Sequence, residues 1–299
     1  MKHPKLKHLI LVGIQDLQEE HFERLQNLCL SPIIIVQKME EVLALGPQIT
    51  QEIKVLLVKR EITVNEKHLK DLPALEYVGV YGTSLKDIHV PSTVNVRGVF
   101  LYCDADTAEF VLIESFKLIR HLGGNPSLQW KQMPESINGL KLGIIGLGAV
   151  GLELAKLMSA HGVEIYYTCH HPSKDEQANK WHFVPMEMME ELYVVSNIIS
   201  IHTPYMNEPF LDKSAFDYMR KDCILVNTSL GTPINTKHLQ QWLKETKGFF
   251  ISDSISTNEL KIDFTHPRMN LVPQYAYKTI SSMSRLGEGL VGELEKWLN

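Results

Sequence analysis

The stretch LGIIGLGAVG, residues 142–151, decides the fold. It joins a short apolar run to three glycines in the pattern G-x-G-x-x-G, and a helical run, LELAKLM, follows. Between a strand and a helix, these glycines permit a tight turn, close approach of a pyrophosphate, and close packing of helix on strand. A further apolar run at 163–168 lies at the distance that a βαβ unit requires. The pattern predicts a dinucleotide-binding turn; the alternative is a glycine-rich turn without a ligand. The residues assigned to the turn are Gly146, Gly148, Ala149, Val150 and Gly151.

The end of the next expected strand bears on the choice of cofactor. An acidic residue about 20 positions after the glycines binds the ribose 2′-hydroxyl of NAD. Here Cys169 holds that place, and His170, His171 and Lys174 follow it. No carboxylate is present to repel a 2′-phosphate, whereas the basic residues could bind one. The sequence therefore favours NADP over NAD; the alternative is that these are solvated loop residues.

Short β-branched runs alternate with helical patterns along most of the chain. Strands are expected at 8–12, 33–36, 53–58, 75–82, 94–100, 141–146, 163–168, 195–201, 223–227 and 248–252. Helices are expected at 18–28, 39–45, 104–121 and 279–298, the last of them long enough to pack on the first domain. Asp104 or Asp106 is expected to cap the third helix. The alternation predicts an α/β protein with helices on both faces of parallel sheets.

Composition limits the class of function. With 299 residues the chain is long enough for about two domains, and a net charge of −5 argues against general electrostatic binding of nucleic acid. The four cysteines lie far apart without metal-ligand spacing, so we expect reduced thiols and no metal site. No secretory signal or long apolar segment appears, which predicts a cytoplasmic protein that does not contact a membrane.

With this order of elements, the chain resembles the D-2-hydroxyacid dehydrogenase family over nearly its full length. The similar motifs are TAEFVLIESFKLIRHL at 107–122, the stretch from IISIHTP to VNTSLG at 198–231, GFFISDSIS at 248–256 and NLVPQYAYKT at 270–279. The resemblance implies two domains, each a doubly wound parallel sheet. A Rossmann-type cofactor domain at 103–274 would be inserted in a flavodoxin-like substrate domain made of 1–102 and 275–299.

The resemblance also implies a homodimer and a second set of cofactor-binding residues. These are Thr203, Pro204, Thr228, Ser229 and Asp253. Asp253 would hydrogen-bond the nicotinamide carboxamide, or else it simply caps the end of its strand. His202 matches a family position on the cofactor side and is interpreted as structural.

Three departures fall on the positions that carry the family's chemistry. Leu230 stands where an arginine holds the substrate carboxylate, and Asn258, with Glu259 one place away, stands where a glutamate pairs with the catalytic histidine. Gln274 replaces that histidine, and a glutamine cannot exchange a proton near neutral pH. Losing a positioned acid or base lowers the rate by about 10²–10⁴-fold. The sequence therefore argues against the ordinary 2-hydroxyacid reaction.

Other residues in the family's layout could take over the proton transfer. The first candidates are Lys86, Tyr275 and Lys278, and the others are His89, Tyr102, Cys103 and Tyr277. A lysine or tyrosine can protonate a carbonyl if its pKa is lowered by burial or a neighbour. The alternative for each is a packing or surface role.

Three hypotheses of function follow from the sequence. The first is an NAD(P)-dependent oxidoreductase with an atypical site and a non-standard substrate. The second is a pseudoenzyme that binds a dinucleotide as a sensor or interaction module. The third is a non-redox enzyme, such as an isomerase or cyclase, that uses the reshaped cleft.

Overall fold

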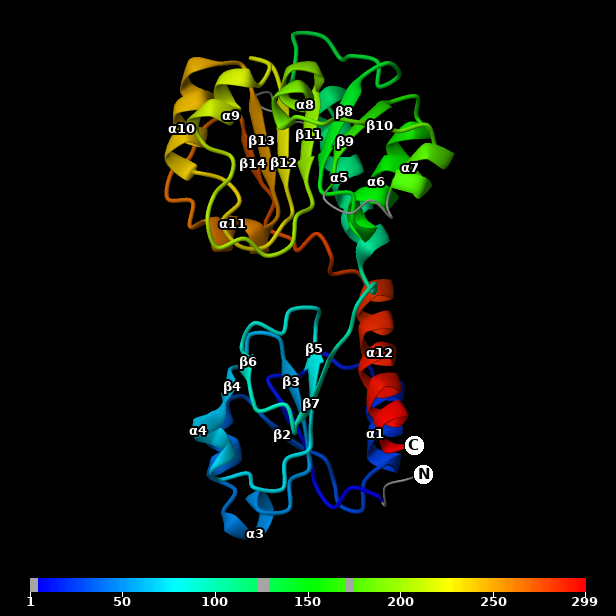
Figure 1. Ribbon diagram of the computed structural model, residues 1–299, viewed down its shortest axis with the longest axis vertical. Helices are drawn as coiled ribbons and strands as arrows, with labels where there is room; N and C mark the ends of the chain where they lie inside the picture. Colours follow the sequence, from blue (N-terminus) through cyan, green and yellow to red (C-terminus); the bar gives the residue numbers. More distant parts are fainter. Residues whose placement is uncertain (1–4, 123–128, 170–174) are drawn as a thin grey trace. The chain divides into compact units, whose positions relative to one another are not determined.

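The computed structural model describes residues 5–122, 129–169 and 175–299, which form two compact units (Figure 1). Met1–Tyr102 and Thr279–Asn299 make the first unit, and Cys103–Lys278 make the second. The second boundary lies four residues later than the expected 275. The physical reason is that the backbone N–H of Ala276 donates to Asp253 Oδ2 at 3.0 Å, which keeps this segment in the second unit.

The first unit is built on a parallel five-stranded sheet in the order β2-β1-β3-β5-β7. Its strands are β1 (Leu9–Val12), β2 (Ile34–Val36), β3 (Val55–Lys59), β5 (Tyr77–Tyr81) and β7 (Asn95–Gly98). A separate pair, β4 (Val64–Asn65) and β6 (Ile88–His89), is also parallel. The helices are α1 (Glu19–Asn27), α2 (Met39–Leu43), α3 (Pro47–Thr50), α4 (Glu66–Leu69) and α12 (Ile280–Leu298). This is the flavodoxin-like order that the sequence predicts.

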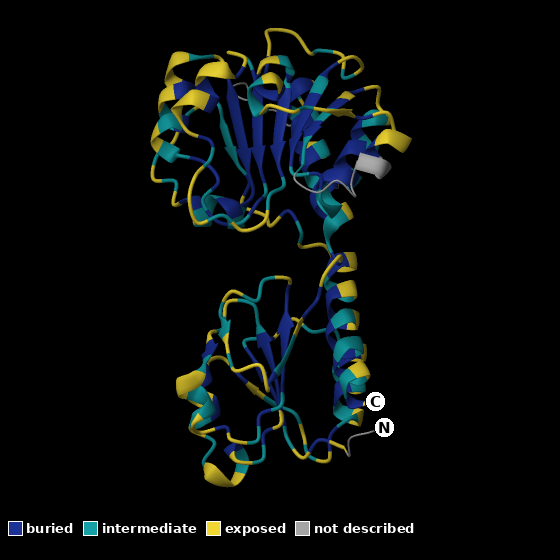
Figure 2. Ribbon diagram, in the orientation of Figure 1, coloured by how far each residue is buried: buried dark blue, intermediate teal, exposed yellow. Residues whose placement is uncertain are grey.

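The three central strands of this sheet, β1, β3 and β5, are almost uninterrupted apolar runs because helices cover both faces. All four residues of β1 are buried. Figure 2 shows the strand ribbons of this sheet largely in dark blue, the colour of buried residues. Ile10 and Val12 pack toward α2, within one apolar cluster. On the other face α12 lies against β5 and α1, which confirms the expected packing of the last helix on the first unit. Gly79 in β5 makes this approach close, because a Cβ there would lie 3.3 Å from a methyl of Leu290.

The second unit is built on a parallel seven-stranded sheet in the order β10-β9-β8-β11-β12-β13-β14, so strand order reverses between β8 and β11. Its strands are β8 (Lys141–Ile145), β9 (Glu164–Thr168), β10 (Val184–Pro185), β11 (Ile198–Ile201), β12 (Ile224–Asn227), β13 (Phe249–Ser252) and β14 (Met269–Leu271). Its helices are α5 (Asp104–Ile119), α6 (Ala149–Ser159), α7 (Asp175–Lys180), α8 (Met189–Val195), α9 (Lys213–Tyr218), α10 (Thr236–Glu245) and α11 (Ser254–Leu260). The order is that of the expected Rossmann-type sheet, extended at one edge by β14.

Alternate strand residues of this sheet feed two apolar clusters. Ile144 and Ile198 pack with α5 and α6 on one face, whereas Ile145 and Ile199 pack with α8, α9 and α10 on the other. The start of α5 differs from the prediction, since Cys103 is its N-cap and the Cys103 side chain makes no capping hydrogen bond. Asp104 and Asp106 lie inside the first turn instead, where a negative charge is favourable beside the helix N-terminus.

Candidate functional site

The glycine turn between β8 and α6 meets the demands of its pattern position by position. Gly146 has φ of 96°, and a Cβ there would lie 2.5 Å from the carbonyl oxygen of His202. Gly151 packs against the backbone of Gly146, so a Cβ at position 151 would collide with it. Gly148 differs from both, because nothing lies within 4 Å of the place its Cβ would take. Two glycines are thus required by the fold, and the third faces open space.

The start of α6 is suited to an anion. Gly148 is its N-cap, and within the described chain no side chain bonds to the first-turn N–H groups. The first turn also lacks acidic residues. Free N–H groups and the positive end of the helix dipole together bind phosphate groups. The turn therefore fits the pyrophosphate of a dinucleotide.

Three polar groups on the neighbouring strand ends have no partner among the described residues. They are Asn227 Nδ2, Thr203 Oγ1 and Thr228 Oγ1. Asn227 is fully buried, and its Oδ1 already accepts from the N–H of Ser229 at 3.3 Å. Since β11 lies between β8 and β12, these groups and the glycine turn share the carboxyl edge of one sheet. A buried polar atom without a partner costs about 1–3 kcal/mol, so this row fits a polar ligand crossing the strand ends.

Asn227 belongs, with Thr228 and Ser229, to the retained run on the nicotinamide side of the site, and its Nδ2 has no partner among the described residues. Its signal was an amide at the last position of the apolar strand ILVN, where a valine or isoleucine would be ordinary.

Ser229 and His202 hold the loops beside this row in place. Ser229 Oγ donates to the carbonyl of Ile201 at 2.9 Å and accepts from the N–H of Thr203 at 3.1 Å. The ring of His202 lies 2.8 Å from Ser200 Oγ, and desolvation lowers the pKa of His202 to about 4. A neutral, bonded histidine at pH 7 agrees with a structural role. Pro204 follows on the surface.

Asp253 is a clamp at the end of β13. Its Oδ1 accepts from the N–H of Ser256 at 3.0 Å, and its Oδ2 accepts from the N–H of Ala276 at 3.0 Å. The side chain is 2% exposed. These bonds make Asp253 the N-cap of α11, and they also fix the segment that carries Gln274.

The three positions that depart from the family pattern lie at one edge of the second unit. Leu230 follows β12 and is half-buried, Asn258 is exposed on α11, and Gln274 is exposed after β14. The carbonyl oxygen of Gln274 accepts from the N–H of Ser254 at 3.0 Å, which brings the β14 loop against the start of α11. None of these three side chains can exchange a proton near neutral pH.

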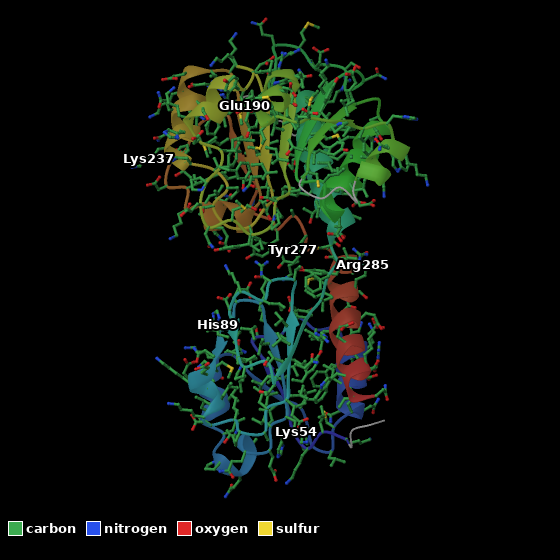
Figure 3. All side chains as sticks on the ribbon, in the orientation of Figure 1. Lys54, His89, Glu190, Lys237, Tyr277 and Arg285 are labelled. Carbon is green, nitrogen blue, oxygen red and sulfur yellow. The ribbon has the colours of Figure 1, made fainter. Side chains whose placement is uncertain are left out.

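The substitute candidates are divided between the units. Tyr275 and Tyr277 stack in the second unit with ring centroids 5.9 Å apart and planes 25° apart. Tyr277 is labelled in Figure 3. Tyr275 is 40% exposed, and exposed Lys278 follows the pair. Lys86 is exposed in the first unit. The structure therefore brings Tyr275 and Lys278 to the edge that carries Gln274.

The other candidates are placed as follows. His89 and Tyr102 lie in the first unit and Cys103 lies at the start of the second. Cys169 is half-buried against the apolar cluster under β8. His170, His171 and Lys174 lie outside the described residues.

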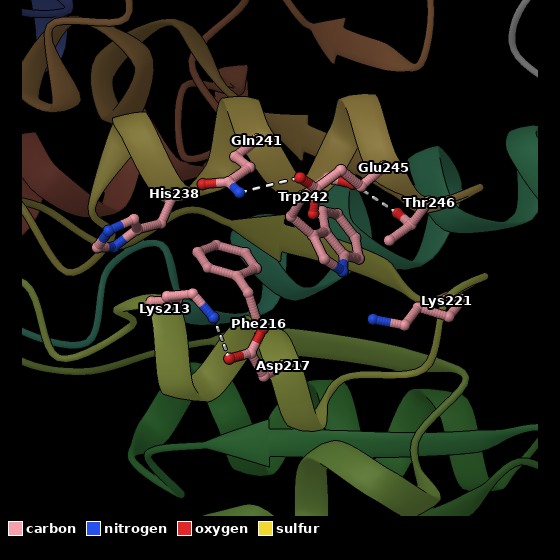
Figure 4. A pocket seen from close by; sticks show the side chains of 9 residues that line it. All are labelled: Lys213, Phe216, Asp217, Lys221, His238, Gln241, Trp242, Glu245 and Thr246. Atoms are coloured by element: carbon pink, nitrogen blue, oxygen red, sulfur yellow. Dashed lines mark hydrogen bonds and ion pairs between the residues drawn. The ribbon is translucent and has the colours of Figure 1, made fainter.

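A small pocket between α9 and α10 is a different feature (Figure 4). Lys221 and Thr246, which line it, precede β12 and β13, so it opens at the amino ends of these strands. The Lys213 and Asp217 side chains within it pair with each other at 2.6 Å, beside buried Trp242. The pocket is thus at the edge opposite the glycine turn.

The described ranges contain neither a cluster of metal ligands nor a helix that could span a membrane. Residues 5–122, 129–169 and 175–299 contain no group of three or more His, Cys, Asp or Glu placed to hold a metal ion. The helices within those ranges are too short or too polar to cross a bilayer.

Comparison with known proteins gives a consistent picture. Residues 122–276 match the family model described as D-isomer specific 2-hydroxyacid dehydrogenase, NAD binding domain. A glyoxylate reductase of Thermococcus litoralis is 25% identical over 233 residues, which cover 71% of this chain and 66% of that protein. A glyoxylate reductase of Aeropyrum pernix is 33% identical over 111 residues, covering 36% and 32%. The chain therefore spans less than two thirds of the length of each of these relatives.

Solved structures agree on the fold. The crystal structure of a glyoxylate reductase from Paecilomyes thermophila aligns with a TM-score of 0.80 and 17% identity, covering 98% of this chain and 95% of that one. At this identity the likeness supports the architecture alone.

Proposed function

Because the chain belongs to the D-isomer specific 2-hydroxyacid dehydrogenase family, we propose that it is an NAD(P)-dependent oxidoreductase with an atypical active site and a non-standard carbonyl substrate. The observation that carries this proposal is the open space in front of Gly148, on the same sheet edge as the unpartnered amide of Asn227. A bound dinucleotide accounts for both features, because its phosphates would occupy the open space and its polar groups would pair with the amide.

The residues of the second unit divide the work of binding in this proposal. The first turn of α6 holds the pyrophosphate, and Thr203, Asn227 and Thr228 hydrogen-bond the polar groups beyond it. The bound cofactor supplies or accepts a hydride. Asp253 fixes the backbone of the following segment, so that Gln274 stays at the rim of the site.

Proton transfer is the step for which the chain departs from its family. Gln274 can donate its amide to a carbonyl oxygen and orient it, but the amide keeps its protons. We assign the proton to Tyr275 or Lys278, two exposed titratable side chains in the segment that follows Gln274. Each would have to lie close to the substrate oxygen when substrate is bound.

NADP is favoured over NAD in this proposal. The strand end after β9 carries Cys169 in place of the acidic residue that binds a ribose 2′-hydroxyl, so a 2′-phosphate meets no carboxylate there. We also expect a homodimer. The half-exposed Ile113 on α5 is an apolar side chain that such an interface could cover.

Substitution of Gly148 tests the cofactor site without disturbing the fold. A side chain in Gly148→Val enters open space, so the variant should fold normally and bind NADPH at least about tenfold more weakly, because the phosphate loses its N–H contacts. Gly292→Val is the matched control, since a Cβ at Gly292 in α12 also meets nothing. Titration followed by nicotinamide fluorescence gives both affinities. Equal affinity in the two variants would contradict the proposed site.

The pseudoenzyme hypothesis is the second candidate, and the neutral side chains of Leu230, Asn258 and Gln274 favour it. A panel of aldehydes and ketones, followed by the absorbance of reduced nicotinamide, separates the two. Oxidation of bound NADPH by a member of the panel supports the oxidoreductase, whereas tight binding without turnover supports a dinucleotide sensor.

A further inference from the structure

A cavity of about 340 Å³ lies at the amino ends of the strands in the first unit's sheet. Leu6, Lys54 and Ala74 line it, and they precede β1, β3 and β5 in turn. All of the residues that line the cavity belong to the first unit. Its volume falls within the range of about 300–1,000 Å³ that is usual for small-molecule sites. The glycine turn lies in the second unit, so this cavity is not part of the cofactor site.

Backbone hydrogen bonds fix two walls of the cavity. The N–H of Leu6 donates to the carbonyl of Leu28 at 2.9 Å, and the N–H of Leu30 donates to the carbonyl of Leu6 at 2.8 Å. The carbonyl of Lys54 accepts from the N–H groups of residues 76 and 77 at 2.9 and 3.0 Å. The backbone on both walls is therefore held in place before a ligand binds, which lowers the entropy cost of binding.

Positive charge predominates along the lining. The cavity is lined by one carboxylate, that of Glu52, and by three ammonium groups. These belong to Lys5, Lys7 and Lys54. Lys7 Nζ pairs with Glu52 Oε1 at 2.5 Å, whereas Lys54 Nζ pairs with Glu76 Oε1 at 2.8 Å. Among the residues that the structure describes, Lys5 has no hydrogen-bond or ion-pair partner. The ammonium of Lys5 is therefore the charge that remains for an anionic ligand.

The indole of Trp297 provides a flat apolar wall. Trp297 lies in the last turn of α12, and its ring packs on that of Tyr77 with centroids 5.0 Å apart. It is half-buried, so part of its side chain faces the cavity that it lines. Buried Leu6 and half-buried Ala74 add further apolar surface. An aromatic ring placed against an indole gains stabilisation beyond that from the area it buries.

We propose that this cavity binds a small aromatic carboxylate of one or two fused rings, since its volume is at the lower end of the usual range. The carboxylate pairs with the ammonium of Lys5, and the ring lies against Trp297 and Leu6. Lysine attracts the carboxylate as a point charge, while the aliphatic lysine stems and the indole cover the ring. A neutral aromatic molecule leaves Lys5 without a partner, so the site discriminates acids from their amides. The inference concerns the first unit alone and is independent of the proposed oxidoreductase function.

Titration of the full chain with 2-naphthoate, and with the neutral 2-naphthamide, tests this charge preference. The indole N–H signals of protein labelled with ¹⁵N-tryptophan report both the affinity and the place of binding, because the chain has four tryptophans. The signal of Trp297, assigned by its loss in Trp297→Phe, should shift, and the other three should not. The acid should bind at least about threefold more tightly than the amide, as expected for charges near the surface.

Two substitutions separate the contributions of charge and ring. Lys5→Gln should weaken binding of the acid by about two- to fivefold and leave the amide unchanged. Lys38→Gln is the matched control, because Lys38 is an exposed lysine of the same unit that follows β2 at the carboxyl edge of the sheet. It should keep the preference for the acid. Trp297→Leu should weaken the acid and the amide alike, by about 2–10-fold, because it removes the ring and keeps the charges.

Several results would overturn the inference. They are no binding of 2-naphthoate, equal affinity for acid and amide, and a shift of another tryptophan signal without that of Trp297. A Lys5→Gln variant that keeps the full preference also overturns it. Lys5 is exposed, so its substitution decides the question even where Trp297→Leu does not fold. Binding of NADPH is measured separately and bears only on the proposed function.

Discussion

Asp253→Asn isolates the clamp that fixes the rim of the cofactor unit. The buried carboxylate accepts one N–H through each oxygen, from Ser256 and from Ala276. An asparagine has the same shape but only one acceptor oxygen, so one of these N–H groups faces an NH₂ instead. The expected cost is about 1–3 kcal/mol, the cost of one unsatisfied buried donor. Asp253→Ala leaves both donors unsatisfied and should cost about 2–6 kcal/mol.

Urea unfolding followed by tryptophan fluorescence measures this loss of stability in the second unit alone. In a Trp297→Phe background the other three tryptophans, Trp130, Trp181 and Trp242, all lie in the second unit, so their fluorescence follows that unit alone. Asp217→Asn, which changes an exposed carboxylate paired with Lys213, is the control and should shift the free energy of unfolding by roughly 0.5 kcal/mol or less. An Asp253→Asn midpoint equal to that of the wild type would refute the clamp.

Two other substitutions give distinct outcomes. Gly287→Ala in α12 should destabilise the first unit by about 1–3 kcal/mol, because a Cβ there would lie 2.5 Å from His21 Nδ1. Gly292→Ala should leave the stability unchanged, because a Cβ at Gly292 meets nothing within 4 Å. Thermal unfolding compares the two variants, and equal melting temperatures would contradict this prediction. Burial lowers the pKa of His202 from 6.5 to about 4. Between pH 6.5 and pH 4 the unfolded chain therefore binds a proton at His202 that the folded chain does not bind. The free energy of unfolding should fall as the pH drops through this range. The loss is at most on the order of 3 kcal/mol, and a His202→Gln variant with an equally steep acid profile would count against it.

The sequence patterns predicted the elements whose signal is local. An unbroken apolar run such as LILV at β1 marks a strand covered on both faces, and the three glycines after β8 mark a turn of one geometry. Two edge strands lacked such a signal. Residues Val184 and Pro185 of β10 are exposed, and the residues of β14 are half-buried, so neither forms an apolar run.

Features that depend on contacts between distant segments were not visible in the sequence. The domain boundary expected at 275 falls after Lys278 because Asp253 holds Ala276. The unpartnered amide of Asn227 likewise becomes evident only once β11 and β12 lie side by side. The assignment of substrates and of the proton donor stays a prediction.

The place of α12 in the first unit has a consequence for synthesis of the chain. This helix is translated after the whole second unit, yet it covers one face of a sheet made from residues that precede that unit. The whole second unit, Cys103–Lys278, is translated in between and contains its own complete core. The inserted unit should therefore fold first in the nascent chain. Until α12 is made, one apolar face of the sheet of the first unit stays exposed to solvent, and holdase chaperones should bind that face.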